Sequence, residues 1–74
     1  MSGLVKRSLL LAGHATSVAL EPEFWAALEA MAARRDVSLT GLIAEIDAAR
    51  AGRPLASACR VAALGFFPDR EPRS

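Results

Sequence analysis

The stretch HATSVALEPEFWAAL, residues 14–28, changes its hydrophobic period in the middle. Polar and apolar residues alternate up to Leu20, and this alternation predicts an extended strand. After Pro22 the apolar residues Phe24 and Leu28 recur at helical spacing, and proline suits the first position of a helix. Because a single strand cannot form a sheet, the fold depends on what this strand pairs with.

Three helices are expected after the strand. Ser38 is a good N-cap for the second helix, and Gly52 followed by Pro54 stops that helix. The third helix is short and mostly apolar, with Arg60 as its one charge. We expect a carboxylate to hold this arginine, with Asp47 as the favoured candidate, because an unpaired charge near apolar surface is costly. The expected helices begin at Pro22, directly after Ser38 and at about Leu55, and they end before Asp36, before Gly52 and at about Phe66.

The chain of 74 residues suffices for one domain, expected over residues 1–67, with a flexible tail over residues 68–74. A core this small is marginal for a monomer. Cys59 is the only cysteine, so no internal disulfide exists, and Cys59 with His14 is too few ligands for a structural zinc site. With 53% hydrophobic residues, the chain is therefore expected to be an obligate homodimer without a metal or cofactor.

The segment KRSLLLAGHATSVAL has the outline of a signal peptide, but His14, Thr16 and Ser17 interrupt its apolar part. No apolar run approaches the roughly 20 residues that a membrane span needs. A lone cysteine suits a reducing compartment. The expected location is the cytoplasm, with no membrane partner.

No second strand is expected after the helices. We expect a mainly α chain with one β-strand (α+β), whose strand pairs antiparallel with that of a second copy in an intertwined homodimer. The alternative is that Val5–Leu11 folds back as a hairpin, because Ala12-Gly13 is compatible with either a turn or a kink. The residues expected in the core or the dimer interface are Val18, Leu20, Phe24, Trp25, Leu28, Leu42, Ile43 and Ile46.

Three segments carry a resemblance to a known family: GHATSVALEPEFW, VSLTGLIAEIDAAR and SACR, which lie within the stretch from Lys6 to Leu64. In this order they resemble the ribbon-helix-helix family of MetJ/Arc-type bacterial repressors. Within it, they look like a subgroup of small bacterial proteins that mostly lack an assigned function. The resemblance implies a ribbon-helix-helix homodimer that binds double-stranded DNA and regulates transcription. Independently of the resemblance, no enzymatic activity is expected, because a core this small is a poor place for a pocket.

In that family the ribbon lies in the major groove of DNA, and the start of the second helix holds phosphates. The resemblance places the DNA contacts at three outward strand positions and at that helix start. Together with the basic pair near the N-terminus, the implied contact residues are Ala15, Ser17, Ala19, Ser38, Leu39, Thr40, Lys6 and Arg7.

The outward strand positions depart from the family, because they hold two alanines and one serine. Paired hydrogen bonds to bases need Arg, Lys, Asn or Gln, so direct base reading is expected to be weak. The net charge of +1 neither establishes nor excludes a nucleic-acid partner. The alternative function is a dimeric module that kept the fold and binds an unidentified protein. No pair of residues suits acid–base catalysis, since Glu45 and Asp47 point in different directions on one helix.

Overall fold

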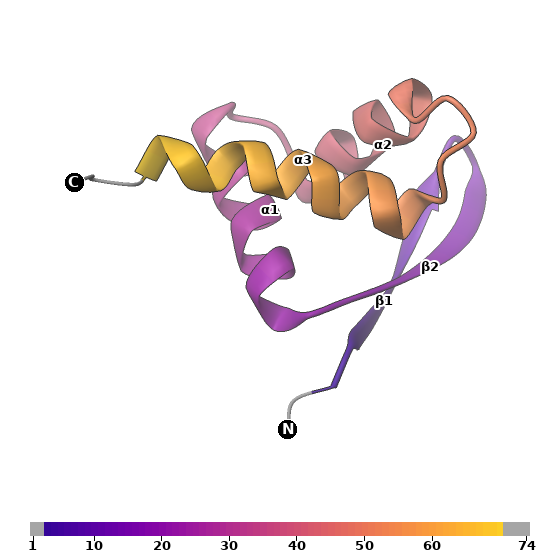
Figure 1. The fold of residues 1–74 in the computed structure, drawn as a ribbon. Coiled ribbons are helices and arrows are strands. Elements are labelled where there is room, and N and C mark those ends of the chain that lie inside the picture. Colours follow the sequence, from indigo (N-terminus) through magenta and orange to yellow (C-terminus); the bar gives the residue numbers. More distant parts are fainter. Residues whose placement is uncertain (1–2, 71–74) are drawn as a thin grey trace.

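The computed structural model describes residues 3–70, and it describes the side chains of residues 3–66. It shows an α+β fold in which a two-stranded antiparallel ribbon is followed by three helices (Figure 1). The fold class expected from the sequence is therefore confirmed, but the expected count of one strand per chain is wrong. The elements are β1 (Val5–Leu11), β2 (His14–Leu20), α1 (Pro22–Arg34), α2 (Leu39–Ala49) and α3 (Leu55–Arg70).

The ribbon is a hairpin within one chain. Its turn consists of Ala12 and Gly13, which both have positive φ angles of 50° and 82°. Two such residues match a two-residue turn whose twist suits paired strands. β1 therefore folds back along β2 in an antiparallel register that runs from Leu11 opposite His14 to Val5 opposite Leu20. The sequence analysis favoured pairing of β2 with the same strand of a second copy, but in the structure β1 of the same chain takes that place.

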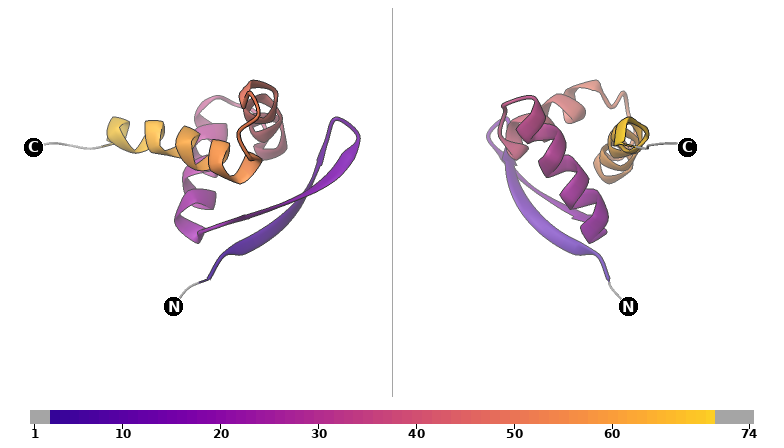
Figure 2. Two further views of the ribbon diagram at one scale, coloured as in Figure 1. Left: turned by 45° about the vertical axis from the view of Figure 1, so that its right-hand side comes forward. Right: turned by 90° about the vertical axis from the view of Figure 1, so that its left-hand side faces the viewer.

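The three helices lie on one side of the hairpin, as both views in Figure 2 show. α2 packs against β1, and α3 packs against β2. A hydrogen bond from Trp25 Nε1 to the carbonyl oxygen of Val5, at 2.7 Å, ties the start of β1 to α1. The hairpin thus has one covered face and one outer face.

The core is closed within the single chain. Six of the eight residues that were expected in the core or the dimer interface are buried, and the other two, Phe24 and Ile46, are partly buried against them. The buried residues are Leu11, Val18, Leu20, Trp25, Ala27, Leu28, Ala32, Leu42, Ile43, Ala58, Cys59 and Ala63. These side chains are therefore not available to a second copy while the chain has this conformation.

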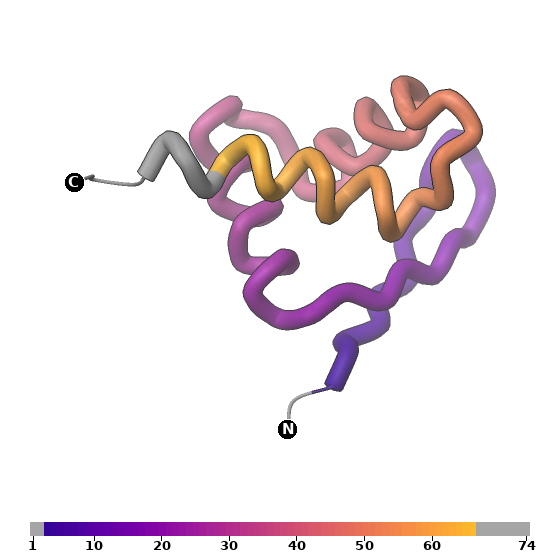
Figure 3. Tube along the Cα trace, viewed as in Figure 1, coloured from indigo at the N-terminus to yellow at the C-terminus, as the bar shows by residue number. Residues whose placement is uncertain are grey.

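Helix α3 covers much of the hydrophobic core. It lies across α1 and α2, as the tube in Figure 3 shows, and it buries the small side chains Ala58, Cys59 and Ala63. Burial raises the pKa of the Cys59 thiol, which acts as a small apolar residue. α3 ends at Arg70, so it includes the first three residues of the expected tail, and residues 71–74 lie outside the described part. No helix within residues 3–70 is long and apolar enough to cross a membrane.

Backbone hydrogen bonds fix the connection between α1 and α2. The backbone N–H of Val37 donates to the carbonyl oxygen of Ala32 at 3.0 Å, and that of Asp36 donates to Ala33 at 3.1 Å. With Asp36 at a φ of 57°, these two bonds form a Schellman motif, which satisfies the carbonyl groups at the end of α1. This motif turns the chain sharply before α2 begins.

Substitutions of the turn residue Ala12 test the hairpin. A left-handed conformation costs a residue with a Cβ atom about 1 kcal/mol, and Asn-Gly is the preferred pair for this turn. We expect Ala12→Asn to raise the free energy of unfolding by about 0.5–1 kcal/mol in urea titrations. Ala12→Val, which adds a β-branched side chain at the same position, should lower it. Equal stability of the two variants would contradict the turn.

Candidate functional site

The outer face of the hairpin carries the residues that the sequence assigned to base contacts. Since Val18 and Leu20 are 3% and 0% exposed on the covered face, alternate residues of β2 point outward. Residues directly opposite each other share a face, so the register adds three residues of β1 to this outer surface. The outer face therefore consists of Lys6, Ser8, Leu10, Ala15, Ser17 and Ala19.

Two of these residues, Ser8 and Leu10, were missed by the sequence analysis. The three consecutive leucines at the end of β1 hide its alternation, so no face could be assigned to this strand from its own pattern. The available signal was Ala12-Gly13 as a two-residue turn, because counting back from it gives the register. Leu10 is 65% exposed, which makes the outer face partly apolar.

The adjacent cations Lys6 and Arg7 point to opposite faces of the hairpin. Arg7 lies on the covered side, where its Nη1 is 2.8 Å from the carboxylate of Glu29 and its guanidinium stacks over the ring of Trp25 at 4.6 Å. Lys6 is exposed on the outer side, and among the described residues it forms no ion pair. Of the expected basic pair, Lys6 alone belongs to the outer face.

The start of α2 forms the second part of the candidate site. Ser38 caps this helix, because its Oγ accepts a hydrogen bond from the backbone N–H of Gly41 at 2.9 Å. The side chain of Thr40 is exposed, whereas that of Leu39 packs against the core. The first N–H groups of any helix lack partners within the helix and lie at its positive end. This end of α2 therefore offers backbone donors that suit an anion.

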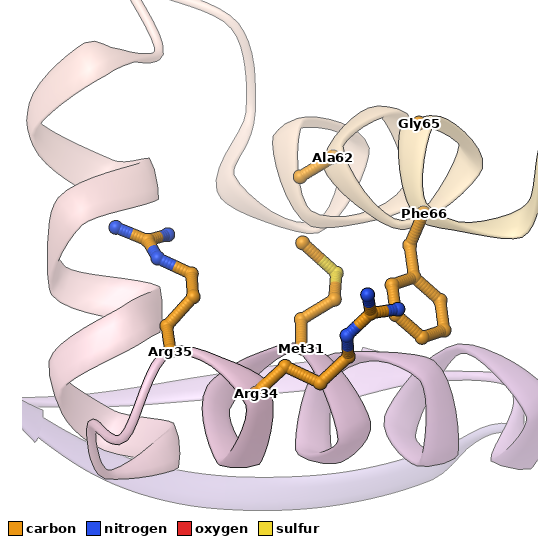
Figure 4. A pocket seen from close by; sticks show the side chains of 6 residues that line it. All are labelled: Met31, Arg34, Arg35, Ala62, Gly65 and Phe66. Carbon is orange, nitrogen blue, oxygen red and sulfur yellow. The ribbon is translucent and has the colours of Figure 1, made fainter. Parts of the chain in front are cut away.

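A cavity of about 400 Å³ lies between α1 and α3, lined by Met31, Arg34, Arg35, Ala62, Gly65 and Phe66. In Figure 4 the guanidinium of Arg34 lies beside the ring of Phe66, at 5.6 Å from its centre, and Arg35 points toward α2. Arg35 Nη2 is 2.5 Å from the carboxylate of Glu45. The lining residues include no carboxylate, histidine or hydroxyl group, so this cavity lacks the groups for acid–base or nucleophilic chemistry.

Arg60 has a carboxylate partner, as expected, but the partner is Glu21 and not Asp47. Arg60 Nε lies 3.0 Å from Glu21 Oε1, and its guanidinium is 5.9 Å from the ring centre of Phe24. Asp47 instead binds Arg50, which is three residues further along the chain, at 2.5 Å. The Glu21–Arg60 pair joins the middle of α3 to the point where β2 leads into α1.

Metal-ligating groups do not gather within the described part of the chain. No three His, Cys, Asp or Glu side chains of residues 3–66 lie close enough together to hold an ion. His14 is exposed at the first position of β2, beside the turn, and Cys59 is buried in α3. Among residues 3–66, neither side chain has a hydrogen-bond or ion-pair partner suited to catalysis.

The comparisons with known proteins agree with this geometry. A family model described as a ribbon-helix-helix domain matches residues 4–67. The chain belongs to the ribbon-helix-helix family. Members of this family are generally DNA-binding transcription regulators, typically homodimers, and not enzymes. No curated protein matches the chain.

A solved structure is similar to nearly the whole chain. It is an uncharacterized protein from Bordetella pertussis Tohama I, with a TM-score of 0.75 and 33% sequence identity over 99% of this chain. The chain spans 66% of the length of that protein. This ribbon-helix-helix protein thus shares its arrangement of elements with a protein that is larger.

The Glu21–Arg60 pair predicts a specific dependence of stability on pH. A hydrogen bond from its own backbone amide, followed by the one from Arg60, holds the pKa of Glu21 below its ordinary 4.5. The lowered pKa stabilises the folded chain above pH 4.5, and this contribution is lost as the pH falls through the folded pKa. We expect Glu21→Gln to destabilise the chain near neutral pH and to have a smaller effect in acid, as measured by urea unfolding.

Glu23→Gln is the matched control for this prediction. Glu23 lies in the first turn of α1 and forms no ion pair with another described residue. We expect the effect of Glu23→Gln on the free energy of unfolding to change less with pH than that of Glu21→Gln. An equal change with pH in both variants would contradict the ion pair between Glu21 and Arg60.

Proposed function

We propose that this ribbon-helix-helix protein is a homodimeric transcription regulator that binds double-stranded DNA in the cytoplasm through the outer face of the hairpin and the start of α2. The observation that supports this function best is the character of the outer face. It belongs to a two-stranded ribbon, which is an element that the major groove admits. Its six residues include one lysine and no acidic residue, so no carboxylate on it opposes the approach of phosphates.

Phosphate contacts are expected to supply most of the affinity. The backbone N–H groups at the start of α2 can donate to phosphate oxygens, and the positive charge of Lys6 adds a salt-sensitive attraction to the DNA backbone. Three arginines are already paired with carboxylates, namely Arg7, Arg35 and Arg60. Binding a phosphate instead would break ion pairs that stabilise the fold. The site thus predicts modest affinity with a clear dependence on salt.

A dimeric protein-interaction module is the second candidate function. Leu4 and Leu10 are 55% and 65% exposed at the hairpin, and such side chains suit an apolar protein surface. A protein partner that is retained after nuclease treatment, together with no duplex binding at low salt, would favour this candidate.

The DNA-binding function is tested with wild-type protein, Ser38→Asp and Ser38→Ala on a short duplex. Asp caps a helix as well as Ser does, so Ser38→Asp should melt like wild type. Its carboxylate should repel a phosphate and weaken binding roughly fivefold, which corresponds to about 1 kcal/mol between two charges in water. Ser38→Ala should lose about 1 kcal/mol of stability and still bind through its backbone N–H groups.

The same titrations give the salt dependence. The logarithm of the wild-type binding constant should fall linearly with the logarithm of salt concentration. Unchanged binding by Ser38→Asp would remove α2 from the interface. No binding by wild type at low salt would overturn the proposed function.

The homodimer is tested by analytical ultracentrifugation. Because the core is closed within one chain, a second copy would cover surface side chains, and Val61 and Leu64 on α3 are 49% and 55% exposed. We expect a dimer at micromolar concentration that dissociates on dilution, and we expect Leu64→Glu to shift it to monomer without lowering the stability of the monomer. A monomer at all concentrations would contradict this proposal.

A further inference from the structure

The hairpin register brings polar groups of β1 onto the face that β2 alone leaves almost without hydrogen-bonding capacity. Lys6 is directly opposite Ala19, and Ser8 is directly opposite Ser17. Counting from the two-residue turn, Ser8 and Ser17 form a pair without mutual backbone hydrogen bonds, in which the Cα atoms are about 4.5 Å apart. The two hydroxyl groups and the ammonium group therefore form one polar cluster on the outer face.

We propose that β1 supplies the base-contacting side chains that β2 lacks, with Lys6 contacting guanine and with Ser8 and Ser17 together contacting a neighbouring base pair. This inference rests on the proposed function and names the residues that would give it sequence preference. On β2 alone, the outer face offers one hydroxyl group per chain for base contacts. With β1 included, it offers two hydroxyl groups and one ammonium group.

The dimensions of the hairpin support simultaneous contact by both strands. The major groove is about 12 Å wide, and neighbouring strands lie about 4.8 Å apart. β1 and β2 of one chain therefore fit side by side in the groove. A sheet of four strands, made by joining two hairpins at their edges, would span about 14 Å between its outer strands and would not enter. Each copy in a dimer would thus present its own hairpin.

The chemistry of the cluster fits base edges. A lysine donates to O6 and N7 of guanine, and serine hydroxyl groups donate to or accept from several base edges. Lys6 is exposed without an ion pair among the described residues, while Arg7 is held on the opposite face by Glu29 and Trp25. The strand thus separates a cation that is available to the groove from one that serves the fold.

The test is a selection of bound duplexes from a random pool, followed by affinity measurements at one salt concentration. The wild-type protein should select a motif that contains a G·C pair. Lys6→Ala should lower the preference for that pair over A·T by at least about fivefold, whereas Lys6→Arg should keep it. Ser8→Ala should relax the preference at a neighbouring position, and Ser8→Thr, which keeps the hydroxyl group, should not.

Arg53→Ala is the matched control. Arg53 lies between α2 and α3, where its Nη1 donates to Ser57 Oγ at 3.3 Å, so its removal takes away one positive charge outside the hairpin. It should weaken binding to all duplexes equally.

If Lys6→Ala also weakens binding to all duplexes equally and no G·C preference is lost, Lys6 contacts phosphate only. The inference is then overturned, while the proposed function stands. If wild type binds no duplex, both fail together. Melting curves confirm that each variant is folded.

Discussion

The two-residue turn at Ala12 and Gly13 is the constraint on which the rest of the structure depends. With both residues at positive φ, β1 must return along β2, so the strand finds its partner within its own chain. The same turn fixes the register, and the register decides which side chains face the helices and which face outward. A slip of one residue would move Lys6 to the covered side and would bring Arg7 to the outer face.

The helices could be predicted from the sequence because their signals are local. Pro22 marks the start of α1, and Ser38 caps α2 as its residue type indicates. The demand of Arg60 for a carboxylate could also be predicted, since it follows from a charge in an apolar segment. The identity of that carboxylate could not be predicted, because Glu21 is 39 residues away along the chain. Glu21 reaches Arg60 only because α3 packs on the start of α1.

The candidate site was predictable in part for a similar reason. The alternation of β2 gave its outward residues directly, but the contribution of β1 depends on pairing between strands, which a single-strand pattern does not contain. The partners in ion pairs between distant elements are likewise not contained in a local sequence pattern. Arg7, Arg35 and Arg60 all serve contacts between elements, and Lys6 is left exposed on the hairpin. A chain with a small net charge thus places an available cation on the face proposed to meet DNA.

The central claim, that β1 and β2 of one chain pair with each other, is tested most directly by isotope-filtered NMR on a sample mixed from labelled and unlabelled chains. The Hα atoms of Ser8 and Ser17 should give a strong contact, because residues directly opposite each other without mutual backbone hydrogen bonds are about 4.5 Å apart at Cα. This contact should appear within one chain and be absent between chains. A contact between Ser17 of a labelled chain and Ser17 of an unlabelled chain, without one between Ser8 and Ser17, would contradict the account.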